Sequence, residues 1–108
     1  MNITYDQFKA TDLRVATVLA ADRVEGSEKL IRMDLDLGEM GKRQIVSGIG
    51  KVYTPEELVG TQIIIVANLE PRSLMGLESH GMLLASGGQE GASLLRPERP
   101  VPAGSAVN

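Results

Sequence analysis

Residues 31–37 read Ile-Arg-Met-Asp-Leu-Asp-Leu, and this stretch decides the fold class. Apolar side chains at its odd-numbered positions alternate with charged side chains at its even-numbered positions. Because successive residues of a strand point to opposite faces, the pattern predicts a half-buried antiparallel strand with one face on a core and one in water. The loop that follows, Gly38 to Lys42, contains two glycines and predicts a hairpin to the next strand.

One further strand is expected on each side of this one in the sequence. Residues 12–19 alternate in the same way upstream. Residues 43–49 pair apolar with polar positions and form the return strand of the hairpin. Gly48 and Gly50 near its end predict a bend or a bulge, which closing a barrel requires.

The remaining strands lie in the second half of the chain. Residues 62–69 are almost all aliphatic, which predicts a strand that is either buried on both faces or covered by an interface. A loop over residues 70–80 is then expected to lead to a short fifth strand, residues 82–85. A glycine-rich turn over residues 87–91 closes that strand.

Two short helices are predicted from their capping residues. Thr4 is a possible N-cap for a helix within residues 3–10, and Thr54 precedes a proline and two acids typical of a first helical turn. No helix is long enough for a parallel crossover. Five short strands with a helix between the third and fourth predict an all-β OB-fold, a five-stranded Greek-key barrel.

The C-terminal tail, residues 94–104, is rich in proline and follows two leucines. It is either a frayed end or an extended arm that docks on the barrel or on a second subunit. The arm is favoured because Leu94, Leu95 and Val101 would otherwise lie in water. We therefore expect one domain, 1–108, with a barrel at about 11–86 and an arm at about 92–108.

Composition narrows the class of protein. At 108 residues the chain is too short for two separate cores, and the absence of cysteine excludes disulfides and thiolate chemistry and fits a reducing compartment. The longest apolar run, residues 63–67, is too short to cross a bilayer, and the N-terminus lacks an apolar signal region. We expect a soluble, cytoplasmic protein. Its net charge of −3 suits a nucleic-acid binder only if the basic residues gather on one face.

A catalytic or metal site is not expected. The run Glu78-Ser79-His80 contains the only histidine, so there is no histidine cluster for zinc, and adjacent residues do not form a hydrolase triad. Asp34 and Asp36 on one strand face could hold a hard cation. Lys42 or Arg43 on the next strand favours cross-strand ion pairs instead. The chain is therefore interpreted as a non-enzyme without cofactor.

Basic residues are placed on the predicted sheet and its loops: Lys29, Arg32, Lys42, Arg43 and Arg72. In an OB-fold the second and third strands form the usual nucleic-acid surface. Aromatic residues are scarce, so a binder of this kind would read backbone shape rather than stack bases on rings. On the charges alone, a merely solvated face remains the alternative.

Several short motifs carry a family resemblance. They are Asp12-Leu13-Arg14-Val15, Val46-Ser47-Gly48-Ile49, Val66-Ala67-Asn68-Leu69, Pro71-Arg72 and the run from Glu78 to Ala85. In this order and spacing, from about Tyr5 to Ala85, they resemble the tRNA-binding domain family. That family includes the C-terminal domain of bacterial methionyl-tRNA synthetases, stand-alone dimeric tRNA-binding proteins and the endothelial monocyte-activating polypeptides.

The resemblance implies an OB-fold that recognises the outside corner of the tRNA L-shape with little regard for anticodon or amino acid. It also implies a homodimer, which we expect to form through the aliphatic fourth strand and the C-terminal arm. A methionyl-tRNA synthetase catalytic domain is a further expected partner, and a membrane is not. With Lys42 added from the charge pattern, the candidate RNA-binding residues are Lys29, Arg32, Lys42, Arg43, Asn68, Arg72, Ser79 and Met82.

The roles of these residues differ. The Arg and Lys side chains would hold phosphates, and Asn68 and Ser79 would meet sugar hydroxyls or phosphates. Three have structural alternatives: Asn68 as a turn cap, Met82 as a core residue and Ser79 as part of a turn.

The main rival function is a protein-binding, chaperone-like dimer within the same fold family. Such a module would need an exposed apolar or methionine-rich surface, whereas the basic residues favour RNA. The chain is interpreted either as a complete protein or as the end of a synthetase.

Overall fold

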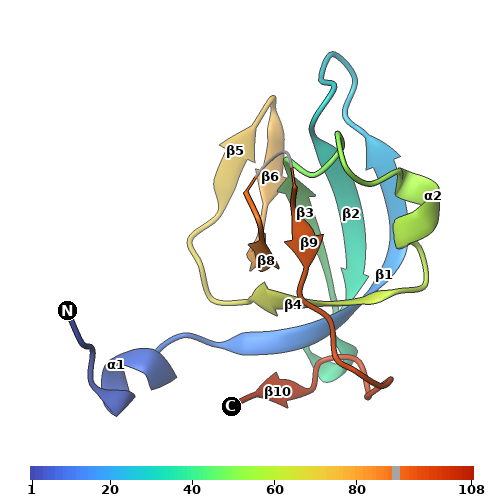
Figure 1. Ribbon diagram of the computed structural model, residues 1–108. Helices are drawn as coiled ribbons and strands as arrows, with labels where there is room; N and C mark the ends of the chain where they lie inside the picture. Colours follow the sequence, from blue (N-terminus) through green and yellow to red (C-terminus); the bar gives the residue numbers. More distant parts are fainter. Residues whose placement is uncertain (89–90) are drawn as a thin grey trace.

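A curled antiparallel sheet forms the body of the protein (Figure 1). The computed structural model describes residues 1–88 and 91–108. Within these residues the central sheet has the strand order β3-β2-β1-β4-β7, with β10 paired to β1 on the side. Its strands are β1 (Leu13–Arg23), β2 (Ile31–Asp36), β3 (Lys42–Ser47), β4 (Gln62–Val66), β7 (Met82–Leu83) and β10 (Ala106–Val107). The all-β, OB-like prediction is confirmed.

The length of β1 curls the sheet. Its first half pairs with β4 and its second half with β2, so one strand serves two neighbours. The register with β2 shifts between Val18 and Ala20, and such an irregularity increases local bending. A bend or a bulge was predicted near Gly48 and Gly50. There β3 ends at Ser47 and the chain bends at Gly48, so the bend is confirmed.

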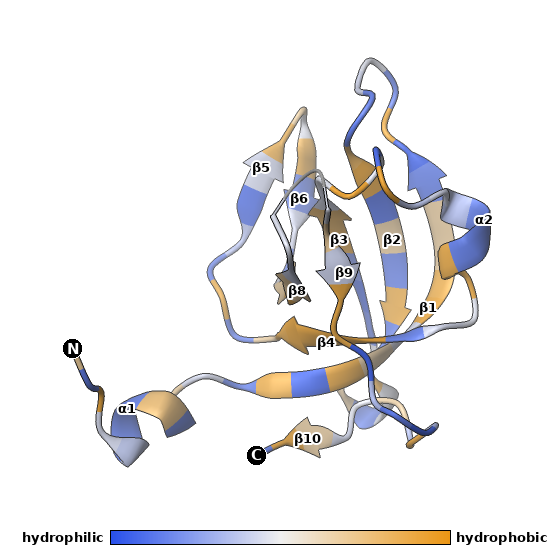
Figure 2. Ribbon diagram, in the orientation of Figure 1, coloured by the Kyte–Doolittle hydropathy of each residue, from blue (hydrophilic) through white to orange (hydrophobic). Residues whose placement is uncertain are grey.

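An aliphatic core fills the concave side of the sheet. The odd-numbered residues of the deciding stretch, from Ile31 to Leu37, are all fully buried, and Figure 2 shows the alternation along β2. They pack with Ile45, Ile63 and Ile65 from the neighbouring strands. Fully burying a side chain of this size contributes roughly 1.5–3 kcal/mol, so this face holds the sheet together.

Both predicted helices are present. Helix α1 (Tyr5–Lys9) begins after Thr4, whose hydroxyl accepts a hydrogen bond from the Gln7 amide at 3.1 Å. It buries none of its residues and lies away from the barrel (Figure 1). Helix α2 (Pro55–Leu58) follows Thr54 and inserts Leu58, which is fully buried, into the core. A short 3₁₀ turn, η1 (Gly38–Met40), connects β2 to β3.

The segment from Glu70 to His80 is a hairpin rather than the predicted loop. Strands β5 (Arg72–Leu74) and β6 (Leu77–Ser79) pair antiparallel across a turn at Met75 and Gly76. Both turn residues have positive φ, 49° and 82°, which matches the tight turns that suit twisted hairpins.

The predicted fifth strand is divided. Its residues form β7 and the start of β8 (Ala85–Ser86), which pairs with β9 (Ser93–Leu94) rather than with the central sheet. Residues 89 and 90 of the predicted turn lie outside the described residues.

The C-terminal tail contacts the barrel of its own chain and is not a frayed end. The Val101 amide donates to Gln62 Oε1 at 3.1 Å, and Gln62 Nε2 donates to the Val101 carbonyl at 2.7 Å. Further on, β10 pairs with the start of β1. No described helix is long and apolar enough to cross a membrane.

This docking overturns one part of the predicted dimer interface. Strand β4 lies between β1 and β7, and its last four residues are buried within a single chain. The Ile64 amide also donates to the carbonyl of Leu95 in the arm. The aliphatic character of β4 is therefore explained by burial on both faces, and β4 offers no surface to a second subunit.

Candidate nucleic-acid interface

On the outer face of β1 and β2, the basic residue Arg32 is neutralised by two neighbouring acids. Arg32 Nη1 lies 2.7 Å from Asp34 Oδ1, and Nη2 contacts Oδ2 of Asp22. The hydrogen bonds to Asp22 and then to Asp34 raise the pKa of Arg32 above its ordinary value. A guanidinium already matched by two carboxylates is a poor phosphate ligand. The structure therefore argues against Arg32 as an RNA contact.

The predicted cross-strand ion pairs of Asp34 and Asp36 are also corrected. In the register of β2 with β3, Asp34 faces Gln44, and Arg43 faces Leu35 on the opposite side of the sheet. Lys42 does face Asp36, but among the described residues Asp34 pairs with Arg32 and no ion pair joins Lys42 to either acid.

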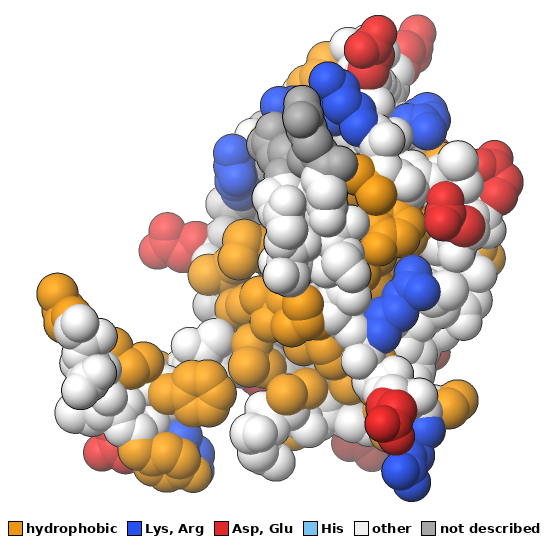
Figure 3. All heavy atoms as spheres, viewed as in Figure 1, with side chains coloured by type: hydrophobic (Ala, Val, Ile, Leu, Met, Phe, Trp, Pro, Cys, Tyr) orange, Lys and Arg blue, Asp and Glu red, His pale blue; other side chains and the backbone are white. Residues whose placement is uncertain are grey.

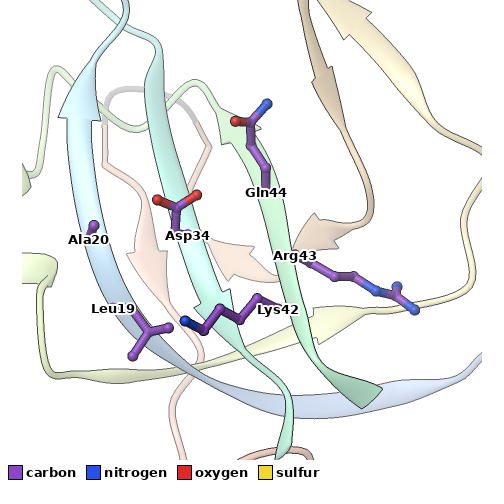
Figure 4. Close-up of a pocket in the computed structure, with 6 residues that line it drawn as sticks. All are labelled: Leu19, Ala20, Asp34, Lys42, Arg43 and Gln44. Atoms are coloured by element: carbon purple, nitrogen blue, oxygen red, sulfur yellow. The ribbon is translucent and has the colours of Figure 1, made fainter.

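Lys42 and Arg43 leave β3 in opposite directions (Figure 4). Lys42 extends over the outer face toward Leu19. Arg43 points past the edge of the strand and donates a hydrogen bond to the carbonyl of Ala67. The side chain of Arg43 therefore bridges β3 and the segment that follows β4.

Two adjoining hollows lie along this edge of β3, and we call them together the edge groove. The first, of about 430 Å³, is lined by Lys42, Arg43, Gln44, Ala67, Leu69 and His80. The second, of about 370 Å³, is lined by Val46, Leu69, Glu70, Arg72, Leu74, Ser79, Gly81 and Met82. Leu69 belongs to both. The edge groove brings together five of the eight predicted residues: Lys42, Arg43, Arg72, Ser79 and Met82.

Hydrogen bonds fasten the β5–β6 hairpin to the edge of β3. Ser79 Oγ accepts from the Val46 amide at 3.0 Å, and Gln44 Nε2 donates to the Glu78 carbonyl at 2.9 Å. Ser79 is 4% exposed, so its hydroxyl is committed to the fold and is not presented to RNA. Ser79 faces Arg72 across the hairpin, so its hydrogen bond to β3 helps to hold Arg72 in position.

Asn68 and Met82 can now be placed. Asn68 Oδ1 accepts from the Asp12 amide at 2.9 Å, and its Nδ2 donates to the Ala10 carbonyl at 2.7 Å. Its amide thus ties the chain between α1 and β1 to the end of β4, which agrees with a structural role. Met82 is 50% exposed, so the alternative that it is a core residue is wrong.

Lys29 lies outside the edge groove, in the loop between β1 and β2. The Gly50 amide donates to the Lys29 carbonyl at 2.7 Å, which brings the loop carrying Lys51 alongside. A Cβ at Gly50 would lie only 2.8 Å from that carbonyl oxygen, so this approach needs glycine. Figure 3 shows both Lys or Arg and Asp or Glu side chains at this end of the molecule.

Sequence reasoning left His80 and Leu69 out of the site. His80 lines the first hollow, and its Nε2 lies 3.6 Å from Oε2 of Glu78. Leu69 separates the hollows and is 45% exposed. Among residues 1–88 and 91–108, no group of three or more His, Cys, Asp or Glu is placed to hold a metal ion.

Known proteins resemble this chain over nearly its whole length. A methionine–tRNA ligase of Methanothrix thermoacetophila is 58% identical over 105 residues, which cover 97% of this chain and 15% of that protein. One of Thermotoga maritima is 50% identical over 106 residues, covering 98% of this chain and 17% of that protein. The chain therefore spans about one-sixth of the length of these relatives.

Two solved structures share the fold. The chaperone CsaA of Bacillus anthracis superposes with a TM-score of 0.91 at 31% identity and covers 100% of both chains. A MetRS-related protein of Pyrococcus horikoshii gives a TM-score of 0.91 at 34% identity, covering 99% of this chain and 98% of that one. The model of the family described as "Putative tRNA binding domain" matches residues 13–106, which include most of the docked arm. The chain therefore belongs to the tRNA-binding domain family.

Proposed function

We propose that this chain binds tRNA through the edge groove, without regard to anticodon or amino acid. The observation that carries the proposal is the placing of Arg43, Arg72 and Lys42 around one groove in a chain of net charge −3. Phosphate contacts fix a protein on folded RNA but carry no sequence information directly. A surface of this kind therefore suits recognition of tRNA shape.

The distribution of charge supports this choice of surface. Asp22 and Asp34 are matched by Arg32 on the outer face of the sheet. Glu70 lines the second hollow, and Glu78 lies close to His80. The negative net charge is thus compatible with a local basic groove.

The relatives suggest the setting of this activity. Methionine–tRNA ligases carry the matched region as a small part of their length. We infer that the chain acts as the tRNA-binding module of a methionyl-tRNA synthetase or as a stand-alone tRNA-binding protein, without catalytic chemistry of its own.

We also propose that the chain forms a homodimer, through α1 and the C-terminal arm rather than through β4. Ile3, Tyr5 and Phe8 are 63%, 72% and 42% exposed, and Tyr5 and Phe8 lie on α1 while Ile3 lies just before it. Figure 3 shows hydrophobic side chains on this segment, which stands apart from the barrel. A hollow of about 220 Å³ lies between α1 and strands β1 and β10. Apolar side chains on so small a helix are best explained by burial against a second copy.

The test is equilibrium binding of bulk tRNA, with a duplex RNA of equal length as control. We expect tighter binding to tRNA, and affinities within a few-fold for several tRNAs of different anticodon. Equal binding to the duplex, or a strong preference for methionine tRNA by this chain alone, would contradict the proposal.

A protein-binding, chaperone-like function is the second candidate. It is favoured by the exposed Leu69 and Met82 in the edge groove and by the likeness to the chaperone CsaA. If the chain suppresses aggregation of an unfolded protein while it fails to bind tRNA, this second function is the better one.

A further inference from the structure

The second hollow of the edge groove has walls that differ from those of the first. Leu69, Leu74 and Met82 supply apolar walls, and the exposed side chains of Glu70 and Arg72 border it. Its volume, about 370 Å³, lies in the range of small-ligand sites. The first hollow, beside it across Leu69, holds Lys42 and Arg43. An apolar recess therefore adjoins the most basic part of the groove.

Part of the lining of the hollow is fixed by the fold. Its floor includes Ser79, whose hydroxyl is fixed by hydrogen bonds to Val46 and Gly81. Gly81 has φ +125°, and a Cβ there would lie 2.9 Å from the carbonyl oxygen of Val66. The backbone at this point admits only glycine, because a Cβ would enter the core beside Ile45 and Ile65, so this part of the lining is held in place by the fold.

We propose that this hollow holds one unstacked nucleobase of the bound RNA, with Leu69 and Met82 against its faces and Glu70 at its edge. The inference rests on the proposed tRNA binding and names a subsite within it. RNA-binding proteins that read single bases take them out of the stack, cover their faces and hydrogen-bond their edges. A thioether and a branched aliphatic side chain provide such a surface where aromatic residues are scarce.

The charged residues that border the hollow favour a nucleobase over a purely apolar group. A base carries polar groups at its edge and is followed on both sides by phosphates. Arg72 borders the same hollow and suits a flanking phosphate. The carboxylate of Glu70 accepts hydrogen bonds only, so it favours a base with an exocyclic amino group over uracil, whose single edge donor, N3–H, lies between two carbonyl oxygens that would repel the carboxylate.

Such a subsite agrees with indifference to the anticodon. The subsite contacts a single nucleotide. If that nucleotide is one that all tRNAs share in the folded corner of the molecule, every tRNA presents the same base to the subsite. The subsite then fixes the register of the protein on tRNA while the basic residues supply affinity.

The first experiment removes one wall. Met82→Ser is compared with the parent in tRNA affinity, in salt dependence and in chemical probing of the tRNA nucleotides. Met40→Ser is the matched control, because Met40 is 38% exposed and lines neither hollow. Without the Met82 side chain one face of the base is uncovered. We expect the tRNA affinity to fall by about fivefold to tenfold, at the lower end of the losses known when an aromatic stacking residue is replaced by alanine. The log–log salt slope stays unchanged because no phosphate contact is lost.

The second experiment tests base identity. The nucleotide that the parent protects from probing is changed to uridine, and the parent and Glu70→Gln are both measured on the two RNAs. We expect the parent to lose affinity on the uridine RNA and Glu70→Gln to bind the two RNAs almost equally. Leu69→Ser serves as a second wall variant should Met82→Ser unfold.

The outcomes separate the subsite from the function. If the parent binds tRNA but Met82→Ser and Leu69→Ser bind like Met40→Ser, the base subsite is wrong and tRNA binding stands. A change of salt slope in Met82→Ser equal to that of Arg72→Ala would also overturn the subsite. If the parent fails to bind tRNA at all, both proposals fall.

Discussion

Arg72 and Ser79 face each other directly across the β5–β6 hairpin, one exposed at the edge groove and the other buried against β3. The Ser79 hydroxyl accepts from the Val46 amide and so joins the hairpin to the sheet. The position of the arginine is thus set by a side chain that does not itself reach the surface. A substitution at Ser79 should therefore alter the position of Arg72.

The first prediction concerns this link. Ser79→Ala leaves the Val46 amide without its partner in a buried place, which should cost about 1–3 kcal/mol of unfolding free energy. The affinity for tRNA should fall as well, because the hairpin that carries Arg72 is loosened. Urea unfolding and tRNA titration measure the two effects. Ser73→Ala, at an exposed serine of β5, is the control and should change neither.

The second prediction separates groove cations from other cations. Arg72→Ala should weaken tRNA binding and lower the log–log salt slope by roughly one unit, the value for one lost phosphate contact. Arg99→Ala is the matched control, because Arg99 is paired with its neighbour Glu98 and lines neither hollow of the groove. Filter binding across a salt series measures both slopes. Identical slopes for the two variants would remove Arg72 from the site.

The elements that could be predicted from sequence are those whose signal is local. The alternation from Ile31 to Leu37 fixes which face of β2 is buried, and the capping residues Thr4 and Thr54 fix where two helices begin. The β5–β6 hairpin was missed because Met75 occupies a left-handed turn position that asparagine, aspartate or glycine usually signals.

The candidate site could be predicted only in part, because its chemistry depends on distant partners. The charge of Arg32 is visible in the sequence, but its pairing with Asp22 depends on the register between two strands. The burial of Ser79 likewise depends on the hairpin lying against β3. The sequence pattern predicts which face of a strand carries a polar side chain. The packing of the strands decides whether that side chain is paired within the protein or available to a ligand.

The third prediction follows from the paired state of Arg32. Arg32→Ala should leave tRNA affinity and its salt slope unchanged, since this guanidinium is already held by two carboxylates. Stability should fall by no more than about 1 kcal/mol, because the paired acids are partly exposed to water. Filter binding and thermal unfolding check the two statements. A loss of salt slope as large as that of Arg72→Ala would place the outer face of the sheet in the RNA interface.

The last prediction concerns the dimer. Light scattering on a sizing column should give the mass of two chains for the parent at tens of micromolar. The double change Tyr5→Ser and Phe8→Ser should give the mass of one chain, because it removes two exposed apolar side chains from α1. Folding should be unaffected, since α1 buries no residue within its own chain. Leu19→Ser, at a leucine 42% exposed on the outer face of the sheet, is the control and should remain dimeric. A parent that runs as a monomer would contradict the dimer, and a variant that stays dimeric would exclude α1 from the interface.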